Sequence, residues 1–503
     1  MKIRYPVIFL FICICMTLIL CLTVCLTACA DKNEDGNTVP AVPTDSNGKT
    51  ADGTETPAEI PDKIIAPIDL PDENFNGRSF NIITPSYDSP ALYQMFVSQV
   101  EDGEIINDAV YKRTVIIEDR YNIKINQTTN DGPAGKAQKS IKAGNDDYNL
   151  IVERAWASFP LANSGMYENM YEIPYVSDSL SEKKPWWNAA LVRDMTINGK
   201  LYFNGGDIIM ADKMLVYMTL FNKKLFAENN IEYPYKYVLD GTWTLDKMFS
   251  ITRGLNKDIN GDGKLDESDR WGLMAEYSTA QRLYASAGEK MIRTDNGGYA
   301  QFSMNTQRSL AVIDKIMPYM LDGESMLKAE DMKNPSNGYS GVYFQDDRIF
   351  MWMATMENII HGNLRAMPTD FGIVPTPKFD EYQEQYCTFM EMSAYMLSIP
   401  VTTDFAFTGL ITEALAYESV STVTPAFYDL TLRVKNTRDD ESEAMLDIIF
   451  NNRNYDIGTF NTNLSVYDIF YSAVADKKTS LVSLMDSRGG KINAAIDKFN
   501  ADY

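Results

Sequence analysis

The sequence has few of the residues on which most enzyme active sites depend. It contains one histidine, His361, among its 503 residues. A Ser-His-Asp or Cys-His catalytic arrangement would have to use that residue, and a metal centre built from several histidines cannot form. No glycine-rich phosphate-binding loop is visible either. We therefore expect no enzyme activity. The alternative that remains is a secreted glycan-acting hydrolase that uses paired carboxylates.

Cysteine is nearly absent beyond residue 29. The sequence has 6 cysteines, and all but Cys387 lie in the first 29 residues. The rest of the chain therefore cannot form an internal disulfide bond or a cysteine-based zinc site. No basic residue adjoins Cys387 in the sequence, so we interpret its thiol as a packed group.

Positive charge is also scarce. The chain has 46 Lys and Arg against 69 Asp and Glu, which gives a formal net charge of -23 at pH 7. Such a field repels the phosphates of nucleic acids and anionic lipids, so we expect no nucleic-acid partner. The hydrophobic share of 45% is that of a soluble globular protein. The length predicts two or three domains, or one large two-lobed body, and we expect a monomer.

The apolar N-terminal run has the features of an export signal. Lys2 and Arg4 precede an apolar stretch from Pro6 to Leu26. Its end, Leu-Thr-Ala-Cys, resembles a bacterial lipobox, which implies removal of residues 1–28 and lipidation of Cys29. The alternative is an uncleaved transmembrane anchor, because about 20 apolar residues can span a bilayer. Both interpretations place the body outside the cytoplasm, with the anchor as its membrane contact.

The next segment, residues 29–70, is rich in Asp, Asn, Thr, Pro and Gly. It has too few apolar residues to offset the entropy of ordering, so we expect a disordered tether. Strands and helices then alternate from residue 78 to residue 152, which predicts βαβ units and a mostly parallel sheet. The fold class is therefore α/β, with a helix-rich C-terminal part. The predicted strands are 78–84, 122–127, 148–152, 200–204, 214–221, 371–374 and 394–399, and the predicted helices are 106–121, 135–142, 244–255, 311–321, 404–417, 441–450, 466–475 and 492–499.

Five segments carry a family resemblance. They are Asp147–Met166, Val216–Asn230, Gly241–Met248, Asn260–Leu273 and Phe371–Pro377. Together, and in this order, they resemble motifs of the family 1 extracellular solute-binding proteins, the sugar-binding group of ABC importers. The stretch 349–354 and the pair Asn229-Asn230 depart from the family pattern.

The resemblance implies a two-lobed, periplasmic-binding-protein-like fold of class II, with the ligand between the lobes. Closure around a hinge would then be the signal that the permease reads. We expect one lobe to comprise 71–210 and 338–399, and the other 211–337 and 400–503. The resemblance also implies a carbohydrate ligand and ABC permease subunits as partners. Together with the aromatic content and the size of the body, it predicts that the carbohydrate is an oligosaccharide. A ligand sensor on the same fold is a further alternative.

Sugar recognition combines flat aromatic faces with carboxylates and amides in one crevice. We selected residues that follow predicted strands, lie beside the expected hinge or match contact positions of the family. The pair Trp186-Trp187 is expected to be exposed in a loop. Core packing is the competing interpretation for each aromatic residue, and a solvated surface for each acid. The candidate ligand-binding residues are Glu153, Arg154, Trp156, Trp186, Trp187, Asp207, Asp212, Glu276, Tyr277, Trp352 and Glu357.

The segment Asp258–Asp269 has the spacing of a calcium-binding loop. Oxygen donors occupy positions 1, 3, 5, 9 and 12, and Gly263 lies at the sharp turn. The alternative is an Asx/Gly turn that links a helix to the next strand. If Ca²⁺ binds, we expect it to act as a structural ion. The candidate ligands are Asp258, Asn260, Asp262, Lys264 through its backbone carbonyl, Asp266 and Asp269.

Overall fold

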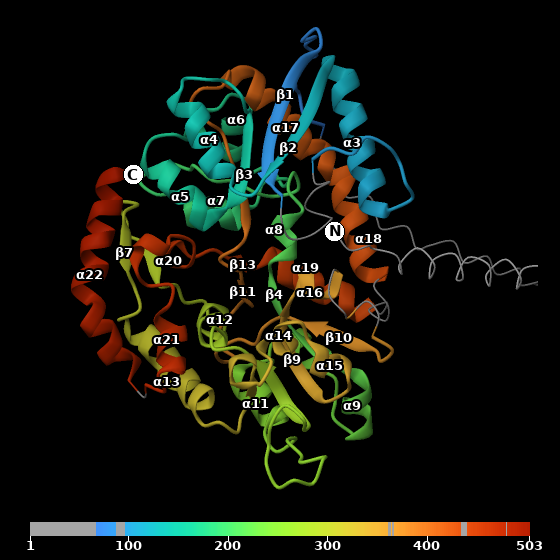
Figure 1. The fold of residues 1–503 in the computed structure, drawn as a ribbon, viewed down its shortest axis with the longest axis vertical. Coiled ribbons are helices and arrows are strands. Elements are labelled where there is room, and N and C mark those ends of the chain that lie inside the picture. The colour runs from blue at the N-terminus through green and yellow to red at the C-terminus, as the bar shows by residue number, and fades with distance from the viewer. Residues whose placement is uncertain (1–66, 87–95, 361–363, 365–366, 434–439, 479) are drawn as a thin grey trace, which may run out of the picture. The chain divides into compact units, whose positions relative to one another are not determined.

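Two β-sheets organise the computed structural model (Figure 1). The structure describes residues 67–86, 96–360, 364, 367–433, 440–478 and 480–503. The predicted signal peptide, Cys29, His361 and the tether up to residue 66 lie outside these residues. Within them, no helix has both the length and the apolar character needed to cross a bilayer.

The first sheet confirms the predicted βαβ order. β1 pairs in parallel with both β2 and β3, and β12 is added antiparallel to β3. Helix α3 connects β1 to β2, and α4 connects β2 to β3. Figure 1 shows α3 beside β2 and α4 beside β3. The bounds are β1 (Arg78–Pro85), α3 (Ile105–Tyr121), β2 (Ile123–Asn130), α4 (Pro133–Lys142), β3 (Leu150–Arg154) and β12 (Tyr395–Ser398).

The second sheet is mixed, in the order β10-β4-β9-β5-β8. Its central strand β9 is a continuous apolar run in which all residues are buried. A fully buried strand shows no alternation, so only its length and its flanking residues mark it in the sequence. β9 and β10 pair with β4, so the expected assignment of residues 338–399 to the first lobe is wrong for these strands. The bounds are β4 (Tyr217–Asn222), β5 (Trp271–Ala275), β8 (Leu327–Lys328), β9 (Ile349–Thr355) and β10 (Phe371–Val374).

The C-terminal part is helical, as predicted, but it does not belong to the second lobe alone. Helices α17 (Phe405–Ser421) and α18 (Val423–Arg433) pack on α3 of the first sheet, whereas α19 (Asp440–Asn451) packs on β10 of the second. The expected assignment of 400–503 to one lobe is therefore also corrected. The predicted helix 492–499 is part of the long α22 (Leu481–Asp502).

The predicted strand 200–204 does not form, because Lys200 and Asn204 make only isolated bridges. Two small ladders, β11 with β13 and β6 with β7, complete the pairing among the described residues. The remaining elements are α5 (Ala155–Asn163), η1 (Met170–Glu172), α6 (Val176–Ser181), α7 (Ala189–Met195), α8 (Ala211–Met214), α9 (Lys223–Glu228), α10 (Tyr235–Leu239), α11 (Leu245–Thr252), α12 (Thr279–Ser286), β6 (Ile292–Thr294), β7 (Ala300–Phe302), α13 (Gln307–Leu321), η2 (Ala329–Asp331), α14 (Pro335–Tyr339), α15 (Val342–Gln345), α16 (Met356–Ile360), β11 (Thr388–Phe389), β13 (Arg453–Asn454), α20 (Ile457–Phe460), η4 (Thr462–Leu464) and α21 (Ile469–Ala475).

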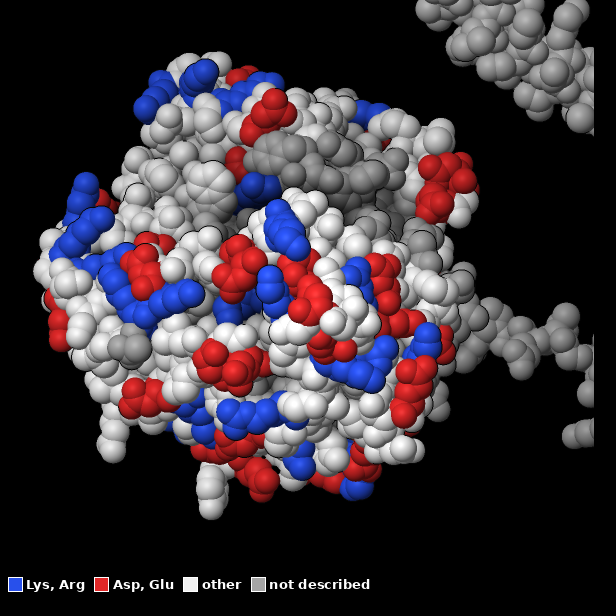
Figure 2. Space-filling view, turned by 60° about the horizontal axis from the view of Figure 1, so that its bottom comes forward, with Lys and Arg blue, Asp and Glu red and all other residues white. Residues whose placement is uncertain are grey.

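Charged side chains of both signs are interspersed on the face drawn in Figure 2. Because neighbouring charges of opposite sign cancel locally, this face carries no extended field of one sign.

Candidate functional site

The C-terminal end of β3 presents one exposed indole ring, that of Trp156, beside two residues of opposite charge, Glu153 and Arg154. Trp156 lies in the first turn of α5 with 38% of its surface exposed. Glu153 is buried, and its carboxylate accepts the backbone N–H groups of Ala134 and Arg154. Nε of Arg154 donates to the hydroxyl of Tyr395 at 3.2 Å. We call Glu153, Arg154, Trp156 and Tyr395 the first strand end.

Glu153 has a structural part in this group. Its Oε2 accepts the N–H of Ala134 at 3.3 Å, in the first turn of α4, where the helix dipole favours a negative charge. The carboxylate therefore fixes α4 against the end of β3. Trp156 is the member of the first strand end that offers a free apolar face.

The C-terminal end of β5 gathers three tyrosines and several carboxylates. The hydroxyl of Tyr277 donates to Asp331 at 2.6 Å, and its backbone N–H is 3.0 Å from both carboxylate oxygens of Glu330. The ring of Tyr471 lies 5.5 Å from that of Tyr277. Tyr339 is 41% exposed, and burial together with Glu330 raises its pKa to about 12.

Arg282 lies at the base of this group. The side chain is 3% exposed, and its guanidinium stacks 3.7 Å from the ring centroid of Tyr217. Nη2 is 2.6 Å from Glu276 and 3.9 Å from Glu391. Nε and Nη1 have no hydrogen-bond partner among the described residues. The second strand end is defined as Tyr217, Glu276, Tyr277, Arg282, Glu330, Asp331, Tyr339, Glu391 and Tyr471.

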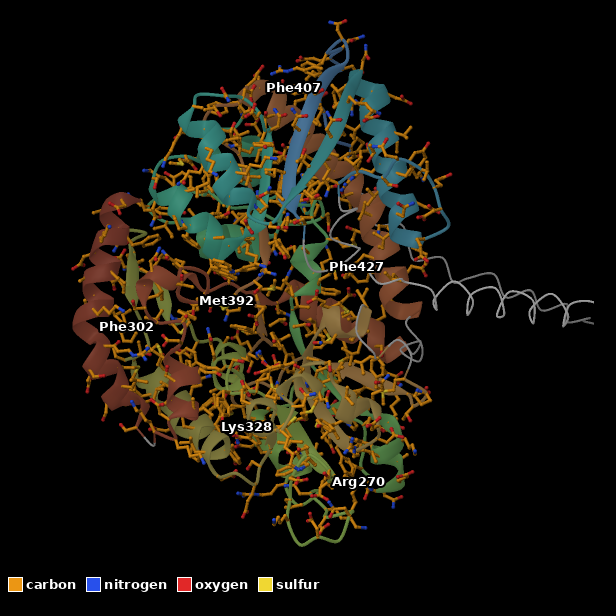
Figure 3. The ribbon with its side chains drawn as sticks, in the orientation of Figure 1. Arg270, Phe302, Lys328, Met392, Phe407 and Phe427 are labelled. Atoms are coloured by element: carbon orange, nitrogen blue, oxygen red, sulfur yellow. The ribbon has the colours of Figure 1, made fainter. Side chains whose placement is uncertain are left out.

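A short segment joins the two strand ends. Glu391 belongs to the second strand end, and Tyr395 to the first. The N–H of Ala394 donates to the carbonyl of Glu391, and the N–H of Ala155 donates to the carbonyl of Ala394. Four residue steps span at most about 14 Å. Glu391 and Tyr395 therefore lie within about 14 Å of each other, and Met392, labelled in Figure 3, is on the segment between them.

Trp186 and Trp187 are buried, so their expected exposure is wrong. Their indole N–H groups donate to the two oxygens of Glu413, at 2.6 and 3.0 Å. Burial raises the pKa of Glu413 to about 7. A buried carboxylate needs donors, and these two rings supply them from inside the core. Trp352 is also buried, and its ring lies 5.9 Å from that of Phe344.

The two aspartates expected near a hinge lie where the chain enters β4, but protein donors occupy their oxygens. Asp207 accepts from Lys213 at 2.8 Å and from the hydroxyl of Thr424 at 2.9 Å. Asp212 is buried and accepts from Arg453, from the hydroxyl of Tyr455 and from the amide of Asn188. These contacts tie distant segments together. Glu357 lies half-buried in the first turn of α16, directly after β9.

The oxygens of the 258–269 loop accept hydrogen bonds from the loop backbone. Asp258 accepts from the N–H groups of Gly261 and Gly263, and Asp269 accepts from those of Ile259 and Asp266. Within the described residues, no group of three or more His, Cys, Asp or Glu side chains is arranged to hold a metal ion. The geometry is that of successive Asx turns. Calcium binding by this loop stays a prediction.

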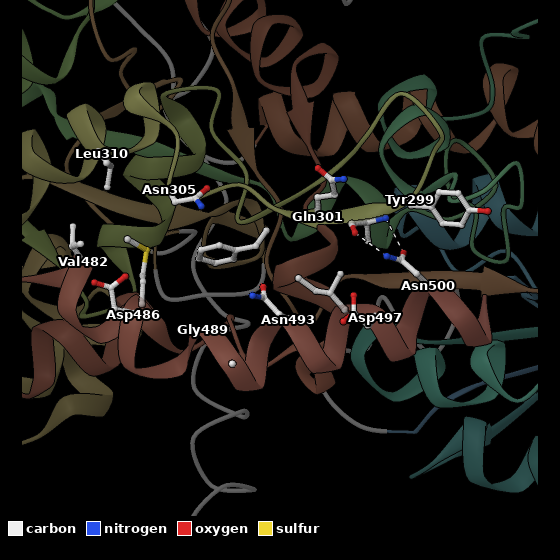
Figure 4. A pocket seen from close by; sticks show the side chains of 15 residues that line it. Tyr299, Gln301, Asn305, Leu310, Val482, Asp486, Gly489, Asn493, Asp497 and Asn500 are labelled. Atoms are coloured by element: carbon white, nitrogen blue, oxygen red, sulfur yellow. Dashed lines mark hydrogen bonds between the residues drawn. The ribbon is translucent and has the colours of Figure 1, made fainter.

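A separate groove runs along α22 (Figure 4). Its volume is about 700 Å³, and Gly489 and Gly490 form part of its wall. A Cβ atom added at either glycine would meet nothing within 4 Å, so the groove is open there. The groove lies between α22 and the β6–β7 hairpin, away from the strand ends of both sheets.

Sequence reasoning found Glu276 and Tyr277 but missed their partners. Apart from α12, which follows β5 directly, those partners come from β4, η2, α14, α21 and the segment before β12, which are distant from β5 in the sequence. Arg282 lies five residues beyond Tyr277, in α12, and a cation in the helix that follows a strand end was the only local signal. The missed residues are Tyr217, Arg282, Glu330, Asp331, Tyr339, Glu391, Tyr395 and Tyr471.

No protein-family model and no curated protein matches the sequence. Solved structures do match. A cyclo/maltodextrin-binding protein in complex with maltotetraose is 13% identical, with a TM-score of 0.54 over 84% of this chain and 97% of its own. A sugar transporter from Rhizobium etli in an open conformation is 12% identical, with a TM-score of 0.54 over 84% of this chain and 98% of its own. The chain therefore has the two-lobed, periplasmic-binding-protein-like α/β fold of such proteins.

Proposed function

We propose that this chain is a member of the family 1 solute-binding proteins and captures a carbohydrate for an ABC importer without converting it. One observation carries the proposal: exposed aromatic rings from α5, α14 and α21 lie next to carboxylates at two joined strand ends. Aromatic faces bind the apolar faces of sugar rings, and carboxylates and amides accept their hydroxyl groups. Ligands of open α/β sheets bind outside the carboxyl ends of the strands.

The fold supports this function. The matching structures are described as a maltodextrin-binding protein with bound maltotetraose and as a sugar transporter. Because their sequence identity to this chain is low, the class of its ligand is argued from the residues of this chain. Trp156 and the tyrosines at the second strand end are the side chains that favour an oligosaccharide over a single sugar, because several rings offer several stacking positions.

Binding is tested by a thermal-shift screen with neutral tetrasaccharides, followed by recovery of the ligand. We expect one saccharide to raise the melting temperature and to be recovered unchanged. Trp156→Ala should reduce the rise, whereas Tyr382→Ala should keep it, because Tyr382 is 93% exposed and belongs to neither strand end. Recovery of cleaved product would favour the paired-carboxylate hydrolase instead, and the absence of any rise would contradict the proposal.

The N-terminal sequence supports a lipid anchor that holds the body on the extracytoplasmic face. We propose that the lipidated residue is Cys29. A Cys29→Ala variant should leave the membrane fraction or retain its signal peptide, and mass spectrometry of the wild-type N-terminus should find the diacylglycerol group. An N-terminus that begins at Met1 in the membrane fraction would contradict lipidation and support a transmembrane anchor.

Delivery to a permease requires a change that the permease can read. We propose that the lobes close around the ligand, as two-lobed binding folds do. Small-angle scattering should then report a smaller radius of gyration with the bound saccharide than without it. An unchanged radius at saturating ligand would favour a binding mode without closure.

A further inference from the structure

The second strand end carries an excess of negative charge. Four carboxylates, those of Glu276, Glu330, Asp331 and Glu391, face two cations. Arg282 is 2.6 Å from Glu276 and 3.9 Å from Glu391, so one guanidinium serves two carboxylates. Lys328 lies 3.8 Å from Asp331.

Glu330 makes no direct ion pair with these cations, although the charge of Arg282 acts to lower its pKa. Among the ion pairs of the described residues it has no cationic partner, and its oxygens accept the backbone N–H of Tyr277. Burial raises the pKa of Glu330, and the neighbouring Glu276 acts in the same direction. Burial raises the pKa of Glu391 as well, with Glu276 again contributing. The negative charges of these carboxylates therefore repel each other within the second strand end.

We propose that the second strand end selects saccharides by charge: it accepts neutral and amino-bearing saccharides and excludes those with carboxylate groups, such as uronates. The inference rests on the proposed carbohydrate binding and names the chemical class of its ligand. An added carboxylate would meet several like charges in a partly buried site, where screening by solvent is weak. A neutral hydroxyl group instead donates to the same carboxylates.

Arg282 provides a second, independent indication that a ligand belongs here. It is buried, yet Nε and Nη1 have no acceptor among the described residues. Both nitrogens are closed to solvent, so a water or a sugar hydroxyl would accept from them only after the side chains around Arg282 move. A uronate carboxylate would accept from them too, so Arg282 alone would favour the opposite selectivity. Because Glu276 and Glu391 already compensate the charge of Arg282, the remaining carboxylates determine whether the site attracts or repels an anionic sugar.

The first strand end does not add to this selectivity. Glu153 and Arg154 are one acid and one base, and the remaining groups, Trp156 and Tyr395, carry no charge at neutral pH. Charge selection is therefore expected to come from the second strand end, and a substitution there should change it.

The test compares matched saccharide pairs by isothermal titration calorimetry on the full chain in mild detergent. The probes are maltotetraose, cellotetraose and mannotetraose, each alongside its form oxidised to the carboxylate at C6. We expect the oxidised form of the best-binding saccharide to bind at least tenfold more weakly at low salt. The ratio should fall as NaCl is raised, because screening weakens the repulsion. An oxidised form that binds equally or more tightly would overturn the inference.

Variants locate the effect. Glu330→Gln should lower the ratio of the two dissociation constants at least threefold. Glu381→Gln removes the same charge from an exposed loop and should leave the ratio unchanged. If Glu330→Gln does not fold, the salt titration of the wild-type chain decides the matter. Failure of all neutral and oxidised probes to bind would overturn the proposed function, which is a different result from binding without charge selection.

Discussion

The two strand ends differ in the side chains that they offer to a ligand. The first offers one exposed indole ring, Trp156, beside a carboxylate held by backbone N–H groups and a guanidinium that donates to Tyr395. The second offers a cluster of tyrosines around a buried arginine that is shared by two carboxylates. The first strand end therefore suits stacking, and the second suits hydrogen bonding to hydroxyl groups. A ligand that contacts both would gain affinity from the first and selectivity from the second.

Tryptophans near the first sheet have opposite roles. Trp186 and Trp187 hold a buried carboxylate, whereas Trp156 has no such partner and lies exposed. The indole rings that donate to Glu413 are buried, and only the ring of Trp156 is exposed for a ligand to stack on. Each prediction below changes one side of this comparison.

The largest expected effect is at the base of the second strand end. Arg282→Met removes the shared cation and leaves Glu276 and Glu391 together without compensation. Breaking a buried ion pair by removing one partner costs about 3 to 5 kcal/mol of unfolding free energy. Chemical denaturation should show this loss, and saccharide binding should be lost with it. A stability within about 1 kcal/mol of wild type would contradict the burial of this pair.

The second effect concerns the core beneath the first sheet. Burial raises the pKa of Glu413 in the folded chain to about 7, from its ordinary value of about 4.5. Between these values the unfolded chain loses its proton and the folded chain keeps it, so stability falls as pH rises from about 4.5 to 7 and then levels off. Each unit of pKa shift corresponds to about 1.4 kcal/mol.

Glu413→Gln cannot lose that proton, so it provides the comparison. The free energy of unfolding of wild type minus that of the variant should fall by about 2 to 3 kcal/mol between pH 4.5 and pH 8. Denaturant titrations at several pH values measure the difference. A difference that rises with pH would show that the two tryptophan N–H donors stabilise the ionised form more than burial opposes it.

The third effect separates binding from stability. Trp156→Ala should weaken saccharide binding by about 2 kcal/mol, because truncation of an aromatic anchor removes the stacking surface. The exposed ring contributes little to folding, so the melting temperature without ligand should change by only a few degrees. Trp156→Phe should retain part of the affinity. Equal losses in the Ala and Phe variants would mean that the flat apolar face is not what binds.

The smallest effect tests the predicted calcium loop, which precedes β5 and so lies at the opposite end of the strand from Glu276. A site with a millimolar-range dissociation constant would add about 1 kcal/mol of stability at an excess of Ca²⁺. Addition of Ca²⁺ after EGTA should raise the melting temperature without changing saccharide affinity. Asp258→Asn should remove the rise. No rise in wild type would leave the loop as a series of Asx turns.

Local structure followed closely from the sequence, and the site followed only in part. The order β1-α3-β2-α4-β3 could be predicted because each element has its own hydrophobic period. β9 was not predicted, although β4, which is also buried throughout, was; a strand without alternation is marked only by its length and its flanking residues. Glu276 and Tyr277 were found from their position after a strand.

Long-range contacts account for the rest. Trp186 and Glu413 are 227 positions apart, so nothing near the tryptophans in the sequence indicates that they are buried. The same holds for Arg282 and Glu391, which meet because α12 packs on β11, two residues before Glu391. Such pairings depend on the packing of two sheets, and a local pattern does not contain them.

The most direct test of the account is the crystal structure of the chain with the neutral tetrasaccharide that gives the largest thermal shift. We predict sugar rings in contact with Trp156 and with Tyr277 or Tyr339, and hydroxyl groups within hydrogen-bond distance of carboxylates at the second strand end. A saccharide bound in the groove along α22, with both strand ends empty, would contradict the account.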